Sequence, residues 1–161
     1  MTIIIMGVTG SGKTTVGTLL AQRLGWTFAD ADDFHTPANK EKMSKGIALT
    51  DADRGPWLDA IHDAIVRWEA AGQNAVVACS ALKQAYRDLL SENVDVKFVY
   101  LKGPAELIIE RLGHRKDHYA KENLVASQFE ALEEPKNSYV VDIGGTPEEI
   151  VGEIRRQLKL H

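Results

Sequence analysis

Cysteine is nearly absent from this 161-residue chain, and so are long apolar runs. The one cysteine, Cys79, cannot form an internal disulfide and gives no spacing of metal ligands. No apolar run approaches the length of a membrane span, and no cationic leader precedes the apolar residues 1–6. These absences predict a cytoplasmic protein that is neither exported nor embedded in a membrane.

An excess of positive charge is also lacking, because the formal net charge is −4. Binding to a phosphate backbone needs basic residues concentrated on one face, so we expect no nucleic-acid partner. Hydrophobic residues make up 44% of the chain and charged residues 26%, which is typical of a globular protein. We therefore expect one domain over residues 1–161.

Short apolar runs rich in β-branched residues alternate with helical patterns along the chain. The runs are unbroken, as expected for strands of a parallel sheet that is covered on both faces. The predicted fold class is therefore α/β, with three layers (α/β/α) and about five parallel strands. The predicted strands are residues 3–5, 27–29, 75–79, 96–101 and 139–143.

Capping signals mark several helices between these strands. Thr36, Thr50 and Thr146 each stand where a helix should begin, and an acid follows three residues after the last two. A polar segment at about residues 113–120 separates two helical patterns and is a candidate lid. The other predicted helices are residues 13–24, 82–90, 104–112 and 121–132.

The most specific motif is Gly7-Val8-Thr9-Gly10-Ser11-Gly12-Lys13-Thr14, which matches the P-loop pattern G-x-x-x-x-G-K-[ST] between a strand and a helix. Its glycines allow backbone N–H groups to turn toward phosphates, and the lysine neutralises the β- and γ-phosphates. The sequence thus predicts a nucleoside triphosphate site. The expected nucleotide contacts are Gly7, Thr9, Gly10, Ser11, Gly12, Lys13, Thr14 and Thr15.

Two other classes of P-loop protein fit the sequence poorly. A GTPase usually carries Asn-Lys-x-Asp, and the nearest match, residues 39–42, ends in Lys42 where an acid should bind guanine. A motor ATPase would place an acid at the end of an apolar strand, but the strand at residues 75–79 is followed by Ser80 and Ala81. A kinase remains the best interpretation.

A kinase needs acids near the phosphates, and Asp30 and Asp32 follow the second strand on the side that faces the P-loop. In an extended stretch, side chains at i and i+2 point the same way, so we expect the two carboxylates on one face. Asp30 would help Thr14 to hold Mg²⁺, and Asp32 would accept the proton of an attacking hydroxyl.

The sequence resembles the gluconate kinases, P-loop enzymes that phosphorylate D-gluconate on its 6-hydroxyl group. The Arg-x-Pro-Trp-Leu and Cys-Ser-Ala-Leu-Lys motifs are more specific to that family than the P-loop. The resemblance covers nearly the whole chain. Its blocks are residues 6–14; residues 30–35 with Asn39, Lys42 and Met43; residues 49–58; residues 79–88; and residues 100–135, including Arg111, Arg115, His118 and residues 127–130.

The resemblance implies a P-loop kinase fold with strand order 2-3-1-4-5, ATP and Mg²⁺ as cofactors, and a homodimer. It implies gluconate ligands among His35, Arg54, Lys83, Arg87 and Gln128, with Asp32 at the reacting hydroxyl. Which of the three cations binds the carboxylate stays open, since Arg54 and Arg87 also have nearby acids as ion-pair partners. The lid residues Arg111 and Arg115 would cover the transferring phosphoryl group.

Two alternatives to a gluconate kinase remain at this point. The first is another small-molecule kinase, of the shikimate or nucleoside-monophosphate kinase type. The second is a regulatory module that binds a nucleotide and a protein partner and hydrolyses slowly. Substrate dependence of ADP release distinguishes all three.

Overall fold

The computed structural model describes residues 1–113 and 118–160, and within them five parallel strands form one sheet. The strand order is β2-β3-β1-β4-β5, which confirms the predicted order. The strands are β1 (Thr2–Met6), β2 (Thr27–Asp30), β3 (Ala75–Ala78), β4 (Val96–Lys102) and β5 (Tyr139–Asp142).

Strand β1 lies in the middle of the sheet, and its side chains are buried on both faces. Because side chains alternate along a strand, Ile3 and Ile5 enter one hydrophobic cluster while Ile4 and Met6 enter the other. This double burial explains the unbroken apolar run. The P-loop follows the carboxyl end of β1, and ligands of α/β proteins bind at the carboxyl ends of the parallel strands.

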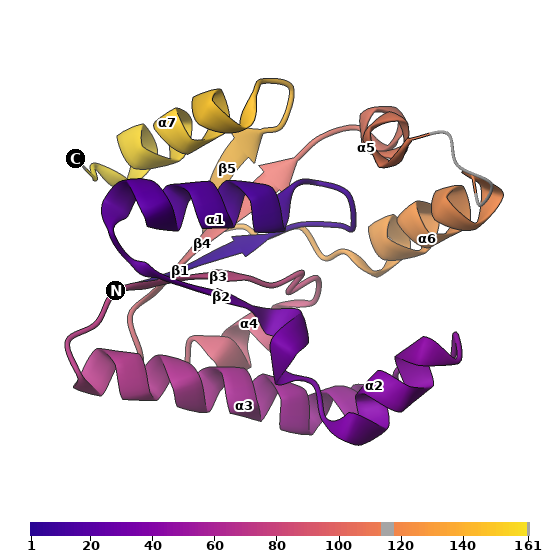
Figure 1. The fold of residues 1–161 in the computed structure, drawn as a ribbon, viewed down its shortest axis with the longest axis horizontal. Coiled ribbons are helices and arrows are strands. Elements are labelled where there is room, and N and C mark those ends of the chain that lie inside the picture. The colour runs from indigo at the N-terminus through magenta and orange to yellow at the C-terminus, as the bar shows by residue number, and fades with distance from the viewer. Residues whose placement is uncertain (114–117, 161) are drawn as a thin grey trace.

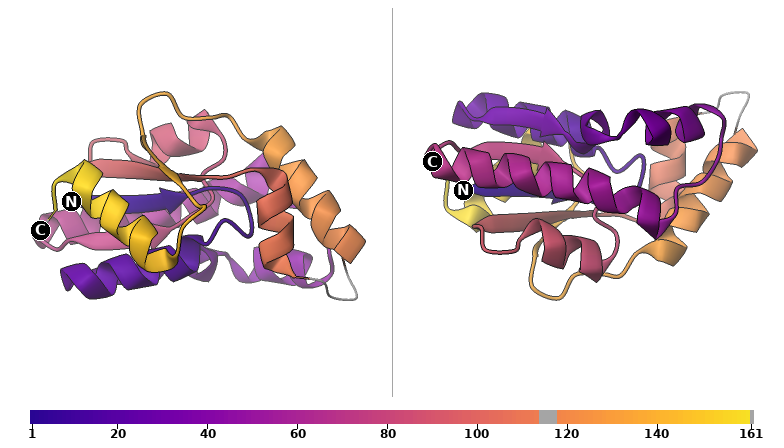
Figure 2. Two further views of the ribbon diagram at one scale, coloured as in Figure 1. Left: turned by 90° about the horizontal axis from the view of Figure 1, so that it is seen from above. Right: turned by 90° about the horizontal axis from the view of Figure 1, so that it is seen from below.

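Helices cover both faces of the sheet (Figure 1). Helices α1 (Lys13–Leu24) and α7 (Pro147–Leu158) lie on one face, and α3 (Asp51–Ala70) and α4 (Gln84–Leu90) lie on the other, as both views of Figure 2 show. Helices α2 (Pro37–Ser44), α5 (Ala105–Leu112) and α6 (His118–Ala131) gather near the carboxyl ends of the strands. In the described part of the chain, no helix combines the length and apolar character needed to span a bilayer.

The predicted helix caps are confirmed. Thr50 and Asp53 form a reciprocal capping box at the start of α3, and Thr146 and Glu149 form another at the start of α7. Some helix boundaries differ from the prediction by one to three residues. Helix α4 begins at Gln84 and not at Leu82, and α6 begins at His118, inside the predicted lid. Residues 114–117 of that lid, with Arg115, lie outside the described residues.

The prediction of an extended stretch from Asp30 to Asp32 is wrong. Strand β2 ends at Asp30, and residues Ala31–Phe34 form a short 3₁₀ helix, η1. The Asp30 side chain accepts a hydrogen bond from the backbone N–H of Asp32, which turns the chain at this point. The position of Asp32 is therefore set by a turn and not by strand alternation.

Candidate active site

The P-loop joins β1 to α1 and packs against α5. Gly12 caps α1 with a φ of 96°, and Gly10 has a φ of 83°, a region that side chains with a Cβ rarely adopt. A Cβ at Gly10 would lie 2.9 Å from Leu112 Cγ and 3.0 Å from Ile108 Cγ2. Glycine is thus required at Gly10 for both backbone conformation and close contact with α5.

Lys13 points back over the loop that carries it. Its Nζ donates a hydrogen bond to the backbone carbonyl of Val8 over 3.1 Å. Burial lowers the pKa of Lys13, and the nearby charges of Asp30 and Asp32 act in the opposite direction. This amine therefore lies in a place where an added phosphate would favour its charged form.

Asp30 links the P-loop helix to the end of β2. Its Oδ2 accepts a hydrogen bond from Thr14 Oγ1 over 3.0 Å, while its Oδ1 accepts the Asp32 N–H over 3.0 Å. A cavity of about 250 Å³ is lined by both aspartates together with Lys13, Thr14, Thr9 and Gly10. The structure therefore brings together the residues predicted to act on the phosphates; Gly7, Ser11, Gly12 and Thr15 lie in or directly after the same loop.

The donors at this cavity suit Mg²⁺. The Thr14 hydroxyl and the Asp30 carboxylate are hard oxygen ligands of the kind that Mg²⁺ takes together with substrate phosphates. Within residues 1–113 and 118–160, no group of three or more His, Cys, Asp or Glu side chains is placed to hold a metal ion by itself. Such a metal would take its remaining ligands from phosphate oxygens and water.

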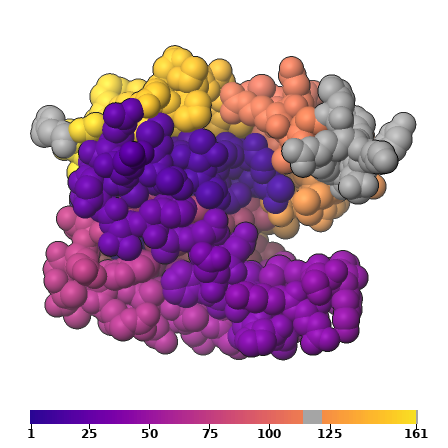
Figure 3. Space-filling model, in the orientation of Figure 1, coloured from indigo at the N-terminus to yellow at the C-terminus, as the bar shows by residue number. Residues whose placement is uncertain are grey.

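A second, smaller cavity of about 90 Å³ adjoins the first. Its lining includes Arg54 and Trp57 from α3 and Lys83 and Tyr86 at the start of α4. Ser80 and Gln128 line both cavities. The space-filling view shows the molecule hollowed between α2 and the part that carries α6 (Figure 3). Two of the predicted cations, Arg54 and Lys83, thus lie next to the phosphate cavity.

Gln128 lines both cavities and contacts the P-loop. Its side-chain oxygen accepts a hydrogen bond from the backbone N–H of Thr9 over 2.6 Å, across 119 positions in sequence. That contact fixes α6 against the P-loop and leaves the amide NH₂ group of Gln128 to serve as a donor. Gln128 is therefore placed to contact both a nucleotide and an acceptor.

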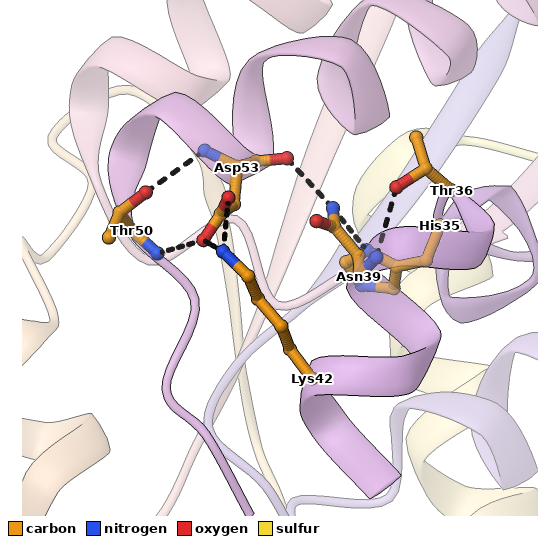
Figure 4. Close-up of polar contacts among 6 residues, drawn as sticks. All are labelled: His35, Thr36, Asn39, Lys42, Thr50 and Asp53. Atoms are coloured by element: carbon orange, nitrogen blue, oxygen red, sulfur yellow. Dashed lines mark hydrogen bonds and ion pairs between the residues drawn. The ribbon is translucent and has the colours of Figure 1, made fainter. Parts of the chain in front are cut away.

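His35 belongs to a network that joins α2 to α3. Its ring stacks on Trp57 with centroids 4.4 Å apart, and Trp57 Nε1 donates to the Ala31 carbonyl over 2.7 Å. The side-chain nitrogen of Asn39, Nδ2, lies 3.5 Å from His35 Nδ1 and donates to the Asp53 carbonyl over 2.7 Å (Figure 4). Burial lowers the pKa of His35, which favours a neutral ring in the stack.

Among the described residues, the linings of the two cavities do not include His35. The same close-up shows Lys42 paired with Asp53, whose carboxylate also accepts the Thr50 N–H (Figure 4). These two contacts lower the pKa of Asp53 to about 2. Asp53 is thus committed to α2 and the cap of α3, and it does not pair with Arg54 as the sequence had allowed.

The structure corrects the candidate role of Arg87. This side chain is 2% exposed, and its guanidinium donates to the carbonyls of Ala81 and Glu133 over 2.6 Å each and to Gln84 Oε1. It lines a separate cavity of about 460 Å³ that holds no P-loop residue among those described. Arg87 joins the β3–α4 connection to the segment after α6, and it is absent from the described linings of the two cavities beside the P-loop.

Replacing Arg87 by methionine should therefore destabilise the protein without weakening the binding of its substrates. Two backbone carbonyls would lose their donor, and we expect the free energy of unfolding to fall by about 2–4 kcal/mol. Urea unfolding measures the loss. As a control, Arg67→Met removes an exposed arginine on α3 and should be nearly neutral. A raised KM for the acceptor in a folded Arg87→Met variant would contradict the structural role.

Arg111 contacts the loop that precedes α7. It is exposed at the end of α5, and its guanidinium donates to the carbonyl of Gly145 over 3.5 Å. Gly145 lies in the loop that precedes α7. Within the described residues, Arg111 is absent from the lining of both cavities.

The parallel sheet in the order β2-β3-β1-β4-β5, the P-loop after β1 and the paired aspartates after β2 define a P-loop kinase. In agreement, residues 9–159 match the profile of the shikimate kinase family. The chain belongs to this family and, within it, to the gluconokinases.

The assignment to the gluconokinases rests on relatives that are similar over most of the chain. The chain is 44% identical to a probable gluconokinase of Xenopus tropicalis over 99% of its length and 96% of the relative's. It is 42% identical to the thermoresistant gluconokinase of Escherichia coli strain K12, over 92% and 87%. The crystal structure of a gluconokinase from Sinorhizobium meliloti 1021 is similar with a TM-score of 0.86 and 40% identity, over 98% of this chain and 91% of that one.

Proposed function

We propose that this kinase transfers the γ-phosphoryl group of ATP to the 6-hydroxyl of D-gluconate, giving 6-phosphogluconate and ADP. The observation that supports it most directly is the pair of adjoining cavities. One is lined by the P-loop and two aspartates, the other by two cations, and they share Ser80 and Gln128. The names of the relatives supply the identity of the acid.

The P-loop residues Gly7, Thr9, Gly10, Ser11, Gly12, Lys13, Thr14 and Thr15 would hold the triphosphate through backbone N–H groups and side chains. Lys13 would balance charge on the γ-phosphoryl group as it moves. Thr14 and Asp30 would hold Mg²⁺, which neutralises negative charge on the phosphate oxygens. Arg111, whose guanidinium donates to the Gly145 carbonyl, and Arg115 stay proposals for covering the transferring phosphoryl group.

Asp32 would orient the 6-hydroxyl and accept its proton as the oxygen attacks phosphorus. The bond from phosphorus to the β–γ bridging oxygen breaks as the new P–O bond forms, and ADP leaves with the electron pair. Asp32 suits this role because its backbone is held by Asp30, which also bonds Thr14. The backbone of Asp32 thus has a fixed position relative to the P-loop helix.

The acceptor would lie with its carboxylate toward Arg54 and Lys83 and its hydroxyl chain toward Gln128. A carboxylate needs cationic donors, and a polyol chain needs neutral hydrogen-bonding groups. His35 would act mainly by supporting Trp57, which lines the acceptor cavity. A homodimer stays a prediction from the family resemblance, and a cytoplasmic location stays a prediction from the composition of the sequence.

The test is ADP release measured with and without D-gluconate. Release should depend on gluconate and vanish with an analogue that lacks the 6-hydroxyl group, because that oxygen is the nucleophile. Shikimate and nucleoside monophosphates serve as the competing acceptors. Faster ADP release with shikimate or a nucleoside monophosphate than with gluconate would overturn the proposal in favour of another kinase. A rate of ADP release that does not depend on any acceptor would overturn it in favour of a nucleotide-binding module.

A further inference from the structure

An acidic side chain, Asp51, already forms ion pairs with Arg54 and Lys83, the two cations of the acceptor cavity. Asp51 Oδ1 lies 3.4 Å from Lys83 Nζ and 3.8 Å from a terminal nitrogen of Arg54. The same oxygen accepts a hydrogen bond from the Tyr86 hydroxyl over 2.6 Å. Asp51 thus makes, with one oxygen, the three contacts that an incoming carboxylate would need.

Tyr86 completes this cluster from α4. Its hydroxyl lies 3.5 Å from Arg54 Nη1, and the centre of its ring lies 5.7 Å from the ammonium group of Lys83. Burial raises the pKa of Tyr86, so its proton stays available for Asp51. The hydrogen bond from Tyr86 and the charge of Lys83 lower the pKa of Asp51, which keeps the carboxylate ionised.

The position of Asp51 explains how the contact can be exchanged. Its side chain is 70% exposed, whereas those of Arg54 and Lys83 are 33% and 36% exposed and line the cavity. An exposed ion pair is weak, because water and salt compete for both charges. The cations can therefore turn from Asp51 at the rim to a ligand inside at small cost.

We propose that Asp51 is an internal counterion that competes with the carboxylate of the acid substrate for Arg54 and Lys83. This inference rests on the proposed function and adds a residue that sets affinity. With Asp51 present, the cluster carries two positive charges and one negative charge. The substrate meets a cavity of reduced positive potential, and the phosphorylated product, which carries more negative charge, is held less tightly. Asp51 thus favours product release.

The test is Asp51→Asn, which keeps the shape and removes the charge. At low ionic strength, KM for D-gluconate should fall by about three- to tenfold. The inhibition constant of 6-phosphogluconate should fall with it, while kcat should not rise. High salt should shrink both effects because it screens exposed charges. The uncharged D-gluconamide, tested as a competitor, should bind equally well to both proteins.

The matched control is Asp59→Asn, which makes the same charge change at an exposed position of α3 beyond the cluster. It should leave KM unchanged. A KM for gluconate that is unchanged or raised in Asp51→Asn, or an equal gain for gluconamide, would overturn the role of Asp51 while leaving the proposed function intact. A wild-type protein without gluconate-dependent ADP release would instead overturn the proposed function and this inference with it.

Discussion

Replacing Asp32 by asparagine should lower kcat with D-gluconate by about 10²–10⁴-fold, because the amide cannot accept the proton of the 6-hydroxyl group. ATP binding should be nearly unchanged, since the backbone of the P-loop and Lys13 stay in place. Asparagine also keeps the backbone N–H that bonds Asp30, so the η1 turn should survive. Steady-state ADP release gives kcat, and calorimetry gives the dissociation constant of ATP.

The neighbouring residue supplies the control for this variant. Asp33 is exposed in the same 3₁₀ turn, and Asp33→Asn makes an identical change of charge one position away. Its kcat should stay close to that of the wild type. Turnover within a few-fold of wild type in Asp32→Asn would remove Asp32 from the role of base, whatever the outcome for Asp33.

The fold could be predicted closely because its signals are local and redundant. Ile3–Ile5 is apolar without a break since β1 is buried on both faces, and Thr50 with Asp53 marks the start of α3 within four residues. The P-loop fixes the connection from β1 to α1 by itself. Such signals need no knowledge of distant parts of the chain.

Where the prediction failed, a side chain competed with the backbone pattern. The chain turns after Asp30 because its carboxylate bonds the Asp32 N–H, and alternation along a strand cannot anticipate this. Arg87 is a similar case. It lies in the same family motif as Lys83, but helix α4 directs it toward the carbonyls of Ala81 and Glu133.

The acceptor cavity shows the limit of motif reasoning most clearly. The motif around Arg54 and the motif around Lys83 each predict a cation, but neither indicates that Asp51 and Tyr86 meet between them across 35 positions. The spacing from Lys83 to Tyr86 does place both on one side of the start of α4. Only the packing of α3 against α4 brings the four side chains together.

The second large effect should come from Lys13. Replacing it by methionine keeps the aliphatic stem but removes the charge beside the γ-phosphoryl group, and kcat/KM for ATP should fall by about 10²–10³-fold. Lys13→Arg should restore little, since a planar guanidinium is larger and has different donor directions. Lys102→Met removes an exposed lysine that pairs with Glu134 and serves as the control.

A second measurement on the same variants tests why Lys13 is so placed. Burial lowers the pKa of Lys13 in the free protein, and the phosphates of ATP would raise it again. Below the lowered pKa the amine is charged before and after binding, whereas at alkaline pH binding should take up a proton. The enthalpy of ATP binding should then depend on the ionisation enthalpy of the buffer. Lys13→Met should abolish this dependence and Lys102→Met should retain it, while equal proton uptake in all three proteins would assign the titrating group elsewhere.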